Sequence, residues 1–178
     1  MESQNSNCKW YALYVRPQYE KIVASQLSGR GYEVYLPTYQ SRRRWSDRTK
    51  TIDVPLFSGY TFCRFDIQRR LPVLTVPGVN FIVGSGKAPI PLDVTELDAI
   101  RLAVNSGLPC EPWPFIKAGH SVRVQYGPLA GLEGLVLNVK DSYRLIISVN
   151  LLGRSVSVEI DRDSVRAFPA AKVLAAAS

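Results

Sequence analysis

Residues 55–65 read Pro-Leu-Phe-Ser-Gly-Tyr-Thr-Phe-Cys-Arg-Phe, and this stretch decides the fold of the first part of the chain. From Tyr60 onward its residues have the alternation of a β-strand. One face of the strand carries Tyr60, Phe62 and Arg64, and the other carries Thr61, Cys63 and Phe65. Pro55 and Gly59 indicate a turn before the strand, because proline lacks the donor that a central ladder needs and glycine permits a tight bend.

The stretch holds more aromatic side chain than one core face needs, which leaves two interpretations. In the first, both faces of the sheet are covered, by a layer of helices and by loops of the same domain. In the second, one face is an aromatic site for another protein, since aromatic side chains dominate binding energy at interfaces. Composition alone does not choose between them.

Length and cysteine content set the broad class of the protein. A chain of 178 residues with ordinary apolar content fits one domain or two small ones. No run of residues is apolar for long enough to cross a bilayer, and residues 1–9 are polar, so we expect no membrane span, no secretory signal and a cytoplasmic protein. The three cysteines, Cys8, Cys63 and Cys110, are far apart and predict reduced thiols rather than a disulfide frame or a zinc site.

The net charge of +7 suggests a polyanionic partner, and its distribution is uneven. Eight basic residues stand against three acids between Arg42 and Arg70. The stretch Arg42-Arg43-Arg44-Trp45-Ser46-Asp47-Arg48 has no periodic apolar positions, which predicts a loop or a hairpin tip. Arginines beside a tryptophan suit phosphate contact with base stacking. A solvated loop whose Trp45 folds back on the sheet is the other interpretation.

The first part of the chain predicts a layered structure of helices and sheet. Periodicity and turn residues predict strands at 10–15, 34–36, 49–54, 60–65 and 80–83, a helix at 20–28, and a helix from Asp93 to Gly107. Asp66 suits the cap of a brief helix at 67–71, which Pro72 should end or bend.

Composition changes after that last helix. Residues 108–114, Leu-Pro-Cys-Glu-Pro-Trp-Pro, predict an extended and semi-stiff connector at a domain boundary. The apolar period is two beyond it, in the groups Val122, Val124 and Tyr126; Leu135, Leu137 and Val139; Leu145, Ile147 and Val149; and Val156, Val158 and Ile160. This pattern predicts four to five short strands in a small barrel, followed by a frayed, alanine-rich tail.

Two groups of residues resemble one known family. Residues 10–17 (Trp-Tyr-Ala-Leu-Tyr-Val-Arg-Pro), the segment 55–66, and Pro77-Gly78-Val79 followed by Phe81 resemble the amino-terminal domain of the NusG family of transcription elongation factors. Val122-Arg123-Val124, the segment 127–134 (Gly-Pro-Leu-Ala-Gly-Leu-Glu-Gly), Leu151-Leu152-Gly153-Arg154 and residues 158–161 resemble the KOW domain of that family.

The resemblance implies an α+β fold with two domains. The amino-terminal domain would span residues 9–107 as an antiparallel sheet flanked by helices. A proline-rich linker at 108–116 would lead to a five-stranded SH3-like KOW barrel at 117–168, and the tail would be 169–178. The alternation of Val and Ile favours a permanent barrel over one that switches to helices as in RfaH. The resemblance implies a monomer with no cofactor and no metal.

The resemblance also implies partners. In the family, the first domain docks on the clamp helices of the RNA polymerase β′ subunit and spans the DNA channel towards the β subunit. The matching positions here are Tyr60 and Phe62, with Phe57 and Phe81 as neighbours. Specialised members resembling RfaH contact the non-template strand at positions matching Tyr14 and Arg16. The basic stretch with Arg42, Arg43, Arg44, Trp45 and Arg48 falls where upstream DNA is expected.

In the KOW domain, the family recruits NusE on the ribosome or the termination factor Rho. The matching positions are Leu129, Leu132, Leu151, Leu152 and Arg154. Aromatic residues are frequent in this region in the family, and Leu129, Leu132 and Leu152 depart from that pattern.

No catalytic set is evident. His120 has no acidic or cysteine companion nearby in sequence, and Gly84-Ser85-Gly86-Lys87 predicts a turn rather than a phosphate loop. Two classes of function remain: a regulator that binds RNA polymerase, and a stand-alone, ribosome-associated RNA-binding KOW protein. Within the first class, residues 14–17 and 55–57 resemble the specialised antiterminator paralogues more than the general factor.

Overall fold

The computed structural model describes residues 7–44, 48–115, 120–139 and 142–167. Its contacts divide the chain into two compact units, whose boundary falls between Asp98 and Ala99, inside helix α3 (Val94–Asn105). The first unit also takes in Val149–Arg154. Among the described residues, no helix is long and apolar enough to cross a membrane.

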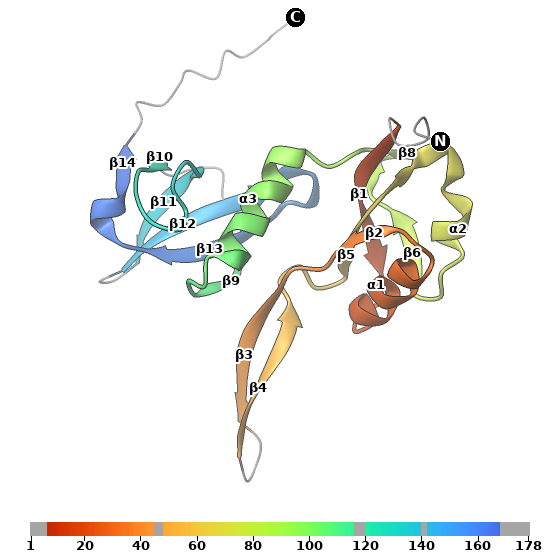
Figure 1. Ribbon diagram of the computed structural model, residues 1–178, viewed down its shortest axis with the longest axis horizontal. Coiled ribbons are helices and arrows are strands. Elements are labelled where there is room, and N and C mark those ends of the chain that lie inside the picture. The colour runs from red at the N-terminus through yellow and green to blue at the C-terminus, as the bar shows by residue number, and fades with distance from the viewer. Residues whose placement is uncertain (1–6, 45–47, 116–119, 140–141, 168–178) are drawn as a thin grey trace, which may run out of the picture. The chain divides into compact units, whose positions relative to one another are not determined.

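A four-stranded sheet with strand order β2-β5-β1-β6 forms the centre of the first unit (Figure 1). Its strands are β1 (Cys8–Val15), β2 (Glu33–Tyr35), β5 (Tyr60–Asp66) and β6 (Val79–Ile82). All three pairings are antiparallel, and the register places Tyr14 opposite Tyr60 and Ala12 opposite Phe62. The predicted antiparallel sheet is confirmed, and so is the predicted alternation along β5.

One face of this sheet carries the main hydrophobic core. Helix α1 (Glu20–Gly29) and the short helix α2 (Leu71–Leu74) contribute Val23, Leu27 and Val73 to it. The strands contribute Tyr11, Leu13, Val15, Cys63 and Phe65 from the same face. Trp10, Ala12, Tyr14, Tyr60, Phe62 and Arg64 therefore share the opposite face, because neighbouring residues of a strand point to opposite sides.

Pro72 does not end the helical segment where the sequence predicted. A 3-10 helix, η1 (Ile67–Arg69), is capped by the Asp66 carboxylate, which accepts a hydrogen bond from the Gln68 N–H at 3.0 Å. A second helix, α2, then begins at Leu71 with Pro72 inside its first turn. Proline is tolerated there because an N–H in the first turn has no partner within the helix.

The basic stretch lies in a two-stranded ribbon outside the main sheet. Strands β3 (Thr38–Arg44) and β4 (Thr49–Pro55) pair antiparallel, and the ribbon projects from the first unit (Figure 1). Arg42, Arg43 and Arg44 therefore belong to a strand, and Trp45 lies outside the described residues. The apolar alternation that signals a strand is missing because neither face of the ribbon belongs to a core. A second small hairpin, β7 (Gly84–Ser85) with β8 (Ala88–Pro89), confirms the predicted turn.

The second unit contains a six-stranded sheet with the order β14-β10-β11-β12-β13-β9. Its strands are β9 (Cys110–Trp113), β10 (His120–Val124), β11 (Glu133–Val139), β12 (Ser142–Val149), β13 (Arg154–Ile160) and β14 (Val165–Ala167). Two 3-10 helices, η2 (Asn150–Leu152) and η3 (Arg162–Ser164), connect the last strands. The four strands predicted from the period of two are confirmed, and the chain has the predicted α+β fold.

Strand β9 was not predicted. The segment 108–114 was expected to be a connector, but Cys110–Trp113 pair antiparallel with β13 and form one edge of the sheet. Prolines hid this strand from pattern analysis, because proline argues against a central strand and is compatible with an edge.

Candidate functional site

Three half-buried or exposed rings form one cluster on the sheet face opposite the core. Tyr14 of β1 meets Tyr60 of β5 edge to face, with ring centroids 5.4 Å apart. Tyr14 also stacks on Phe81 of β6, with centroids 5.0 Å apart. Tyr14 and Tyr60 are half-buried, and Phe81 has 52% of its surface exposed. We call Tyr14, Tyr60 and Phe81 the open aromatic cluster.

The other two predicted contact rings lie in a closed group. Phe62 is 1% exposed and Phe57 is 3% exposed. The Phe62 ring packs against Phe57 at 5.6 Å and against Tyr35 of β2 at 6.3 Å. Phe57 and Phe62 are therefore the buried members of the set predicted to contact RNA polymerase, which is Tyr60, Phe62, Phe57 and Phe81. Phe62 lies on a central strand opposite Ala12, whose small side chain leaves space for a neighbouring ring.

A buried carboxylate positions the turn that precedes the aromatic strand. Glu20, the first residue of α1, is 4% exposed, and its Oε1 accepts a hydrogen bond from the Gly59 N–H at 2.8 Å. The Gly59 carbonyl in turn accepts a hydrogen bond from the Val15 N–H at 2.8 Å. Gly59 has φ of +83°, which favours glycine. Helix α1, strand β1 and the start of β5 are thereby joined next to Tyr60.

Arg16 follows directly after β1 and is exposed. Its guanidinium carbon lies 5.0 Å from the centroid of the Tyr19 ring, within the range of a cation–π contact. Its backbone N–H donates to the Gly78 carbonyl at 2.8 Å. Arg16 is thus two residues from Tyr14 of the open aromatic cluster in the sequence, and its charge lies over the Tyr19 ring.

The exposed cations of the β3–β4 ribbon lie towards the end where Arg44 pairs with Thr49. Arg42, Arg48 and Lys50 are exposed. The register pairs Arg42 with Thr51 and Arg43 with Lys50. At the root, Lys21 Nζ of α1 donates to the Asp53 carbonyl at 2.7 Å. Three other predicted DNA contacts are not described at this level. The backbones of Arg43 and Arg44 are described but their side chains are not, and Trp45 lies outside the described residues.

The loop residues predicted to contact a partner through the KOW domain differ in exposure. Leu129 is 1% exposed and Leu132 is 7% exposed, so both serve the interior rather than the surface. Leu151 and Leu152 of η2 are half-buried, and Arg154 is exposed. Of the five predicted partner contacts, Arg154 is the most accessible.

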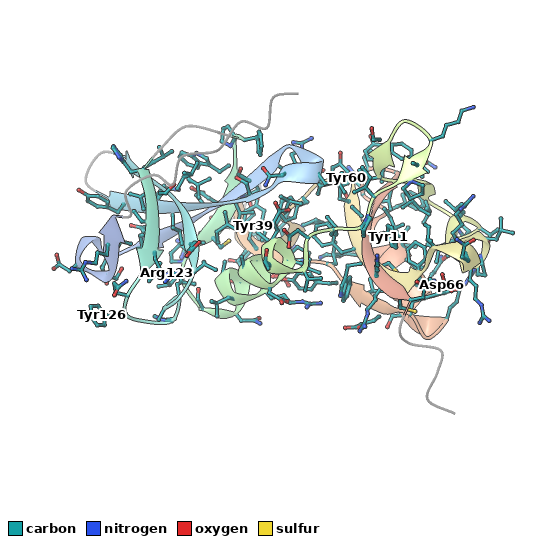
Figure 2. The ribbon with its side chains drawn as sticks, turned by 90° about the horizontal axis from the view of Figure 1, so that it is seen from above. Tyr11, Tyr39, Tyr60, Asp66, Arg123 and Tyr126 are labelled. Atoms are coloured by element: carbon teal, nitrogen blue, oxygen red, sulfur yellow. The ribbon has the colours of Figure 1, made fainter. Side chains whose placement is uncertain are left out.

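Sequence reasoning missed the exposed ring of that loop. Tyr126 was grouped with Val122 and Val124 as part of one inward stripe, yet 72% of its surface is exposed. Figure 2 shows its side chain standing away from the ribbon. The stripe ends early because β10 ends at Val124. The Gly127-Pro128 turn that follows was the signal for this ending.

Two thiols of the described residues have raised pKa values. No group of three or more His, Cys, Asp and Glu side chains is placed to hold a metal ion in this part of the chain. His120 is exposed at the start of β10. Burial, with a smaller effect of Glu33, raises the pKa of Cys63 to about 12, and burial with Glu111 raises that of Cys110 to about 11. All three cysteines are free, as predicted.

Comparison with known proteins identifies relatives over most of the chain. The family described as "NusG: Transcription termination factor nusG" matches residues 8–101. A Pseudomonas aeruginosa protein named "Transcription termination/antitermination protein NusG" is 28% identical, over 88% of this chain and 97% of that protein. Proteins of the same name from Haemophilus influenzae and Thermus thermophilus are 29% and 27% identical, over 90% and 88% of this chain and 94% and 97% of theirs.

A solved structure has the same fold. The structure titled "Domain interaction in Thermotoga maritima NusG" matches with a TM-score of 0.57 and 21% identity, over 91% of this chain and 98% of that one. The family match covers more than half of the chain and includes the open aromatic cluster and the whole β3–β4 ribbon. The chain belongs to the NusG family of transcription termination and antitermination factors.

Proposed function

We propose that this chain is a cytoplasmic elongation and antitermination factor that binds RNA polymerase through its open aromatic cluster. The observation that carries the proposal is the position of Tyr14, Tyr60 and Phe81, which lie on the sheet face opposite the core with surface left exposed. Aromatic side chains in such positions are the residues that supply most of the binding energy at protein interfaces. The proposed partner surface is the pair of clamp helices of the polymerase β′ subunit. From there the first domain would span the DNA channel towards the β subunit.

The β3–β4 ribbon is proposed as the nucleic-acid contact. Arg42, Arg48 and Lys50 are exposed and suit contact with phosphates, which does not depend on base sequence. Arg16 is proposed to contact the non-template strand, and the ribbon with Arg43, Arg44 and Trp45 the upstream DNA. Tyr14 is placed with the polymerase contacts instead, because its ring packs on Tyr60 and Phe81.

Residues 117–168 are proposed to be a KOW domain that recruits a further partner. NusE on the ribosome and the termination factor Rho are the candidates that the family offers. Arg154 is exposed, and Leu151 and Leu152 are half-buried, so this corner is the proposed contact. Leu129 and Leu132 are proposed to support the loop from inside. The amino-terminal domain is proposed to span residues 9–107.

Sedimentation with purified RNA polymerase tests the proposal. The wild-type chain should sediment with the polymerase, and the double variant Tyr60→Ala/Phe81→Ala should stay in the supernatant at the same concentration. A double variant of the ribbon, Arg42→Ala/Arg48→Ala, should still sediment with polymerase and lose crosslinking to upstream DNA in an elongation complex. If the aromatic variant sediments like wild type, the proposal is wrong; RNA binding without polymerase binding would favour a stand-alone KOW protein.

A further inference from the structure

Strand β9 covers the outer edge of β13 with a regular ladder. The register pairs Trp113 with Ser155, Glu111 with Ser157 and Cys110 with Val158. One step further along, the Glu159 N–H donates to the Pro109 carbonyl at 3.2 Å.

Antiparallel ladders alternate between hydrogen-bonded and non-hydrogen-bonded pairs. Since the Glu159 N–H points to the β9 side, the amides of Ser155 and Ser157 point there too. The amides of Val156 and Val158 therefore point to β12, the neighbour on the other side of β13.

One proline of β9 fits that ladder. Pro112 stands opposite Val156, at a position where its N–H would point away from β13. The β9–β13 pairing therefore loses no hydrogen bond because of Pro112. The outer edge of β9, however, has one N–H donor fewer. Proline on an edge strand prevents another strand from adding to the sheet. Strand β9 thus ends the sheet as well as covering β13.

One side chain from β12 reaches across β13 and contacts β9 at two points. The Arg144 Nη1 forms an ion pair with the Glu111 carboxylate, and the same atom donates to Ser157 Oγ at 3.2 Å. The guanidinium carbon of Arg144 also lies 5.1 Å from the centroid of the Trp113 ring. The ion pair is partly exposed, with 49% of the Glu111 side chain accessible, so the side-chain part of this attachment is weak.

We propose that β9 is a detachable cover of a strand-pairing site on β13, held closed by Arg144. When β9 leaves, the amide and carbonyl groups of Ser155, Ser157 and Glu159 become an open sheet edge. The ligand class that takes such an edge is an extended peptide strand of another protein, bound by main-chain hydrogen bonds. The proposal does not depend on polymerase binding.

Hydrogen exchange of individual amides in the full chain tests the cover. Glu111→Gln removes the ion pair with Arg144, and Glu133→Gln is a matched control that removes the ion pair of Arg123 elsewhere in the same sheet. Trp113→Ala removes the ring beneath the guanidinium. We expect about tenfold faster exchange at Ser155, Ser157 and Glu159 in Trp113→Ala, and a smaller gain in Glu111→Gln. Val156 and Val158 should keep their wild-type rates, and the control should change none of these amides.

Equal acceleration of both sets of amides would show general loosening of the sheet and overturn the proposal, as would no acceleration at all. A second measurement uses a synthetic peptide with the sequence of residues 108–115, labelled with a fluorophore. It should bind the Trp113→Ala chain more tightly than the wild-type chain, whose edge is already occupied. Equal binding to both chains, or binding to neither, contradicts an edge that β9 opens and closes.

Discussion

The carboxylate of Glu20 and the N–H of Gly59 are joined by a 2.8 Å hydrogen bond that lies in the interior of the first unit. This bond attaches the first turn of α1 to the residue immediately before Tyr60. A buried acceptor of this kind is costly to remove, because the donor left behind has no water to replace it.

Glu20→Ala should therefore lower the free energy of unfolding by about 1–3 kcal/mol. Glu20→Gln should cost less, because its amide oxygen still accepts from Gly59. Chemical denaturation of both variants checks this order. The account of this bond fails if the glutamine variant is as unstable as the alanine variant.

Gly59→Ala should disturb Tyr14 as well as the turn. A Cβ at this position would lie 3.3 Å from Cε2 of the Tyr14 ring, and the backbone φ of +83° adds strain of about 1–2 kcal/mol. Gly131→Ala is the matched control, since Gly131 has φ of +87° with open space around a Cβ. The control should lose stability without moving the Tyr14 ring resonances, and Gly59→Ala should move them. Unchanged Tyr14 resonances in Gly59→Ala would contradict the contact.

Thr95 should lower the pKa of Asp93 at the start of α3. The Asp93 carboxylate accepts hydrogen bonds from the Thr95 hydroxyl at 2.7 Å and from the Thr95 N–H at 2.8 Å, and these bonds lower its pKa. Because the folded pKa lies below the unfolded one, this contribution is present at neutral pH and is lost as the pH falls through the folded pKa. Thr95→Val should raise the pKa of Asp93 in a carboxyl NMR titration, and Thr95→Ser should not. Equal pKa values in the two variants would assign the shift to another cause.

Cys110 should react slowly with alkylating reagents at neutral pH. Burial and the nearby Glu111 charge raise its pKa to about 11, and only the thiolate is the nucleophile. The alkylation rate should rise about tenfold per pH unit above pH 7, with no plateau below pH 10. Trp113→Ala should speed the reaction if it frees β9. Peptide mass spectrometry resolves Cys110 from Cys8 and Cys63, and a plateau near pH 8 would contradict a raised pKa.

The sequence allowed prediction of those elements whose local pattern agrees with their place in the fold. Tyr60 to Phe65 alternate because one face of β5 belongs to the core, and that alternation is visible without coordinates. Helix α3 was predicted from Asp93 and the apolar spacing after it, and the structure begins it at Val94.

The remaining features depend on contacts that are distant in sequence. Strand β4 of the arginine-rich ribbon was predicted at 49–54, but its partner β3 has no apolar periodicity and was not. Strand β9 depends on β13 and on Arg144, more than 30 residues later in the chain, and its prolines suggest a connector. Pattern analysis also does not separate Phe62 from Phe81. Phe62 is closed in by the rings of Phe57 and Tyr35, whereas Phe81 is on an edge strand and has 52% of its surface exposed.

The affinity of the Phe81→Ala chain for RNA polymerase tests the central claim most directly, because Phe81 is exposed enough for truncation to leave the core intact. Tyr126→Ala is the matched control, an exposed aromatic of the second unit. We expect the dissociation constant of Phe81→Ala to rise about tenfold or more, as for a central interface aromatic, and that of Tyr126→Ala to equal the wild-type value. A Phe81→Ala chain that binds polymerase as tightly as the wild type would contradict the claim that the open aromatic cluster is the polymerase contact.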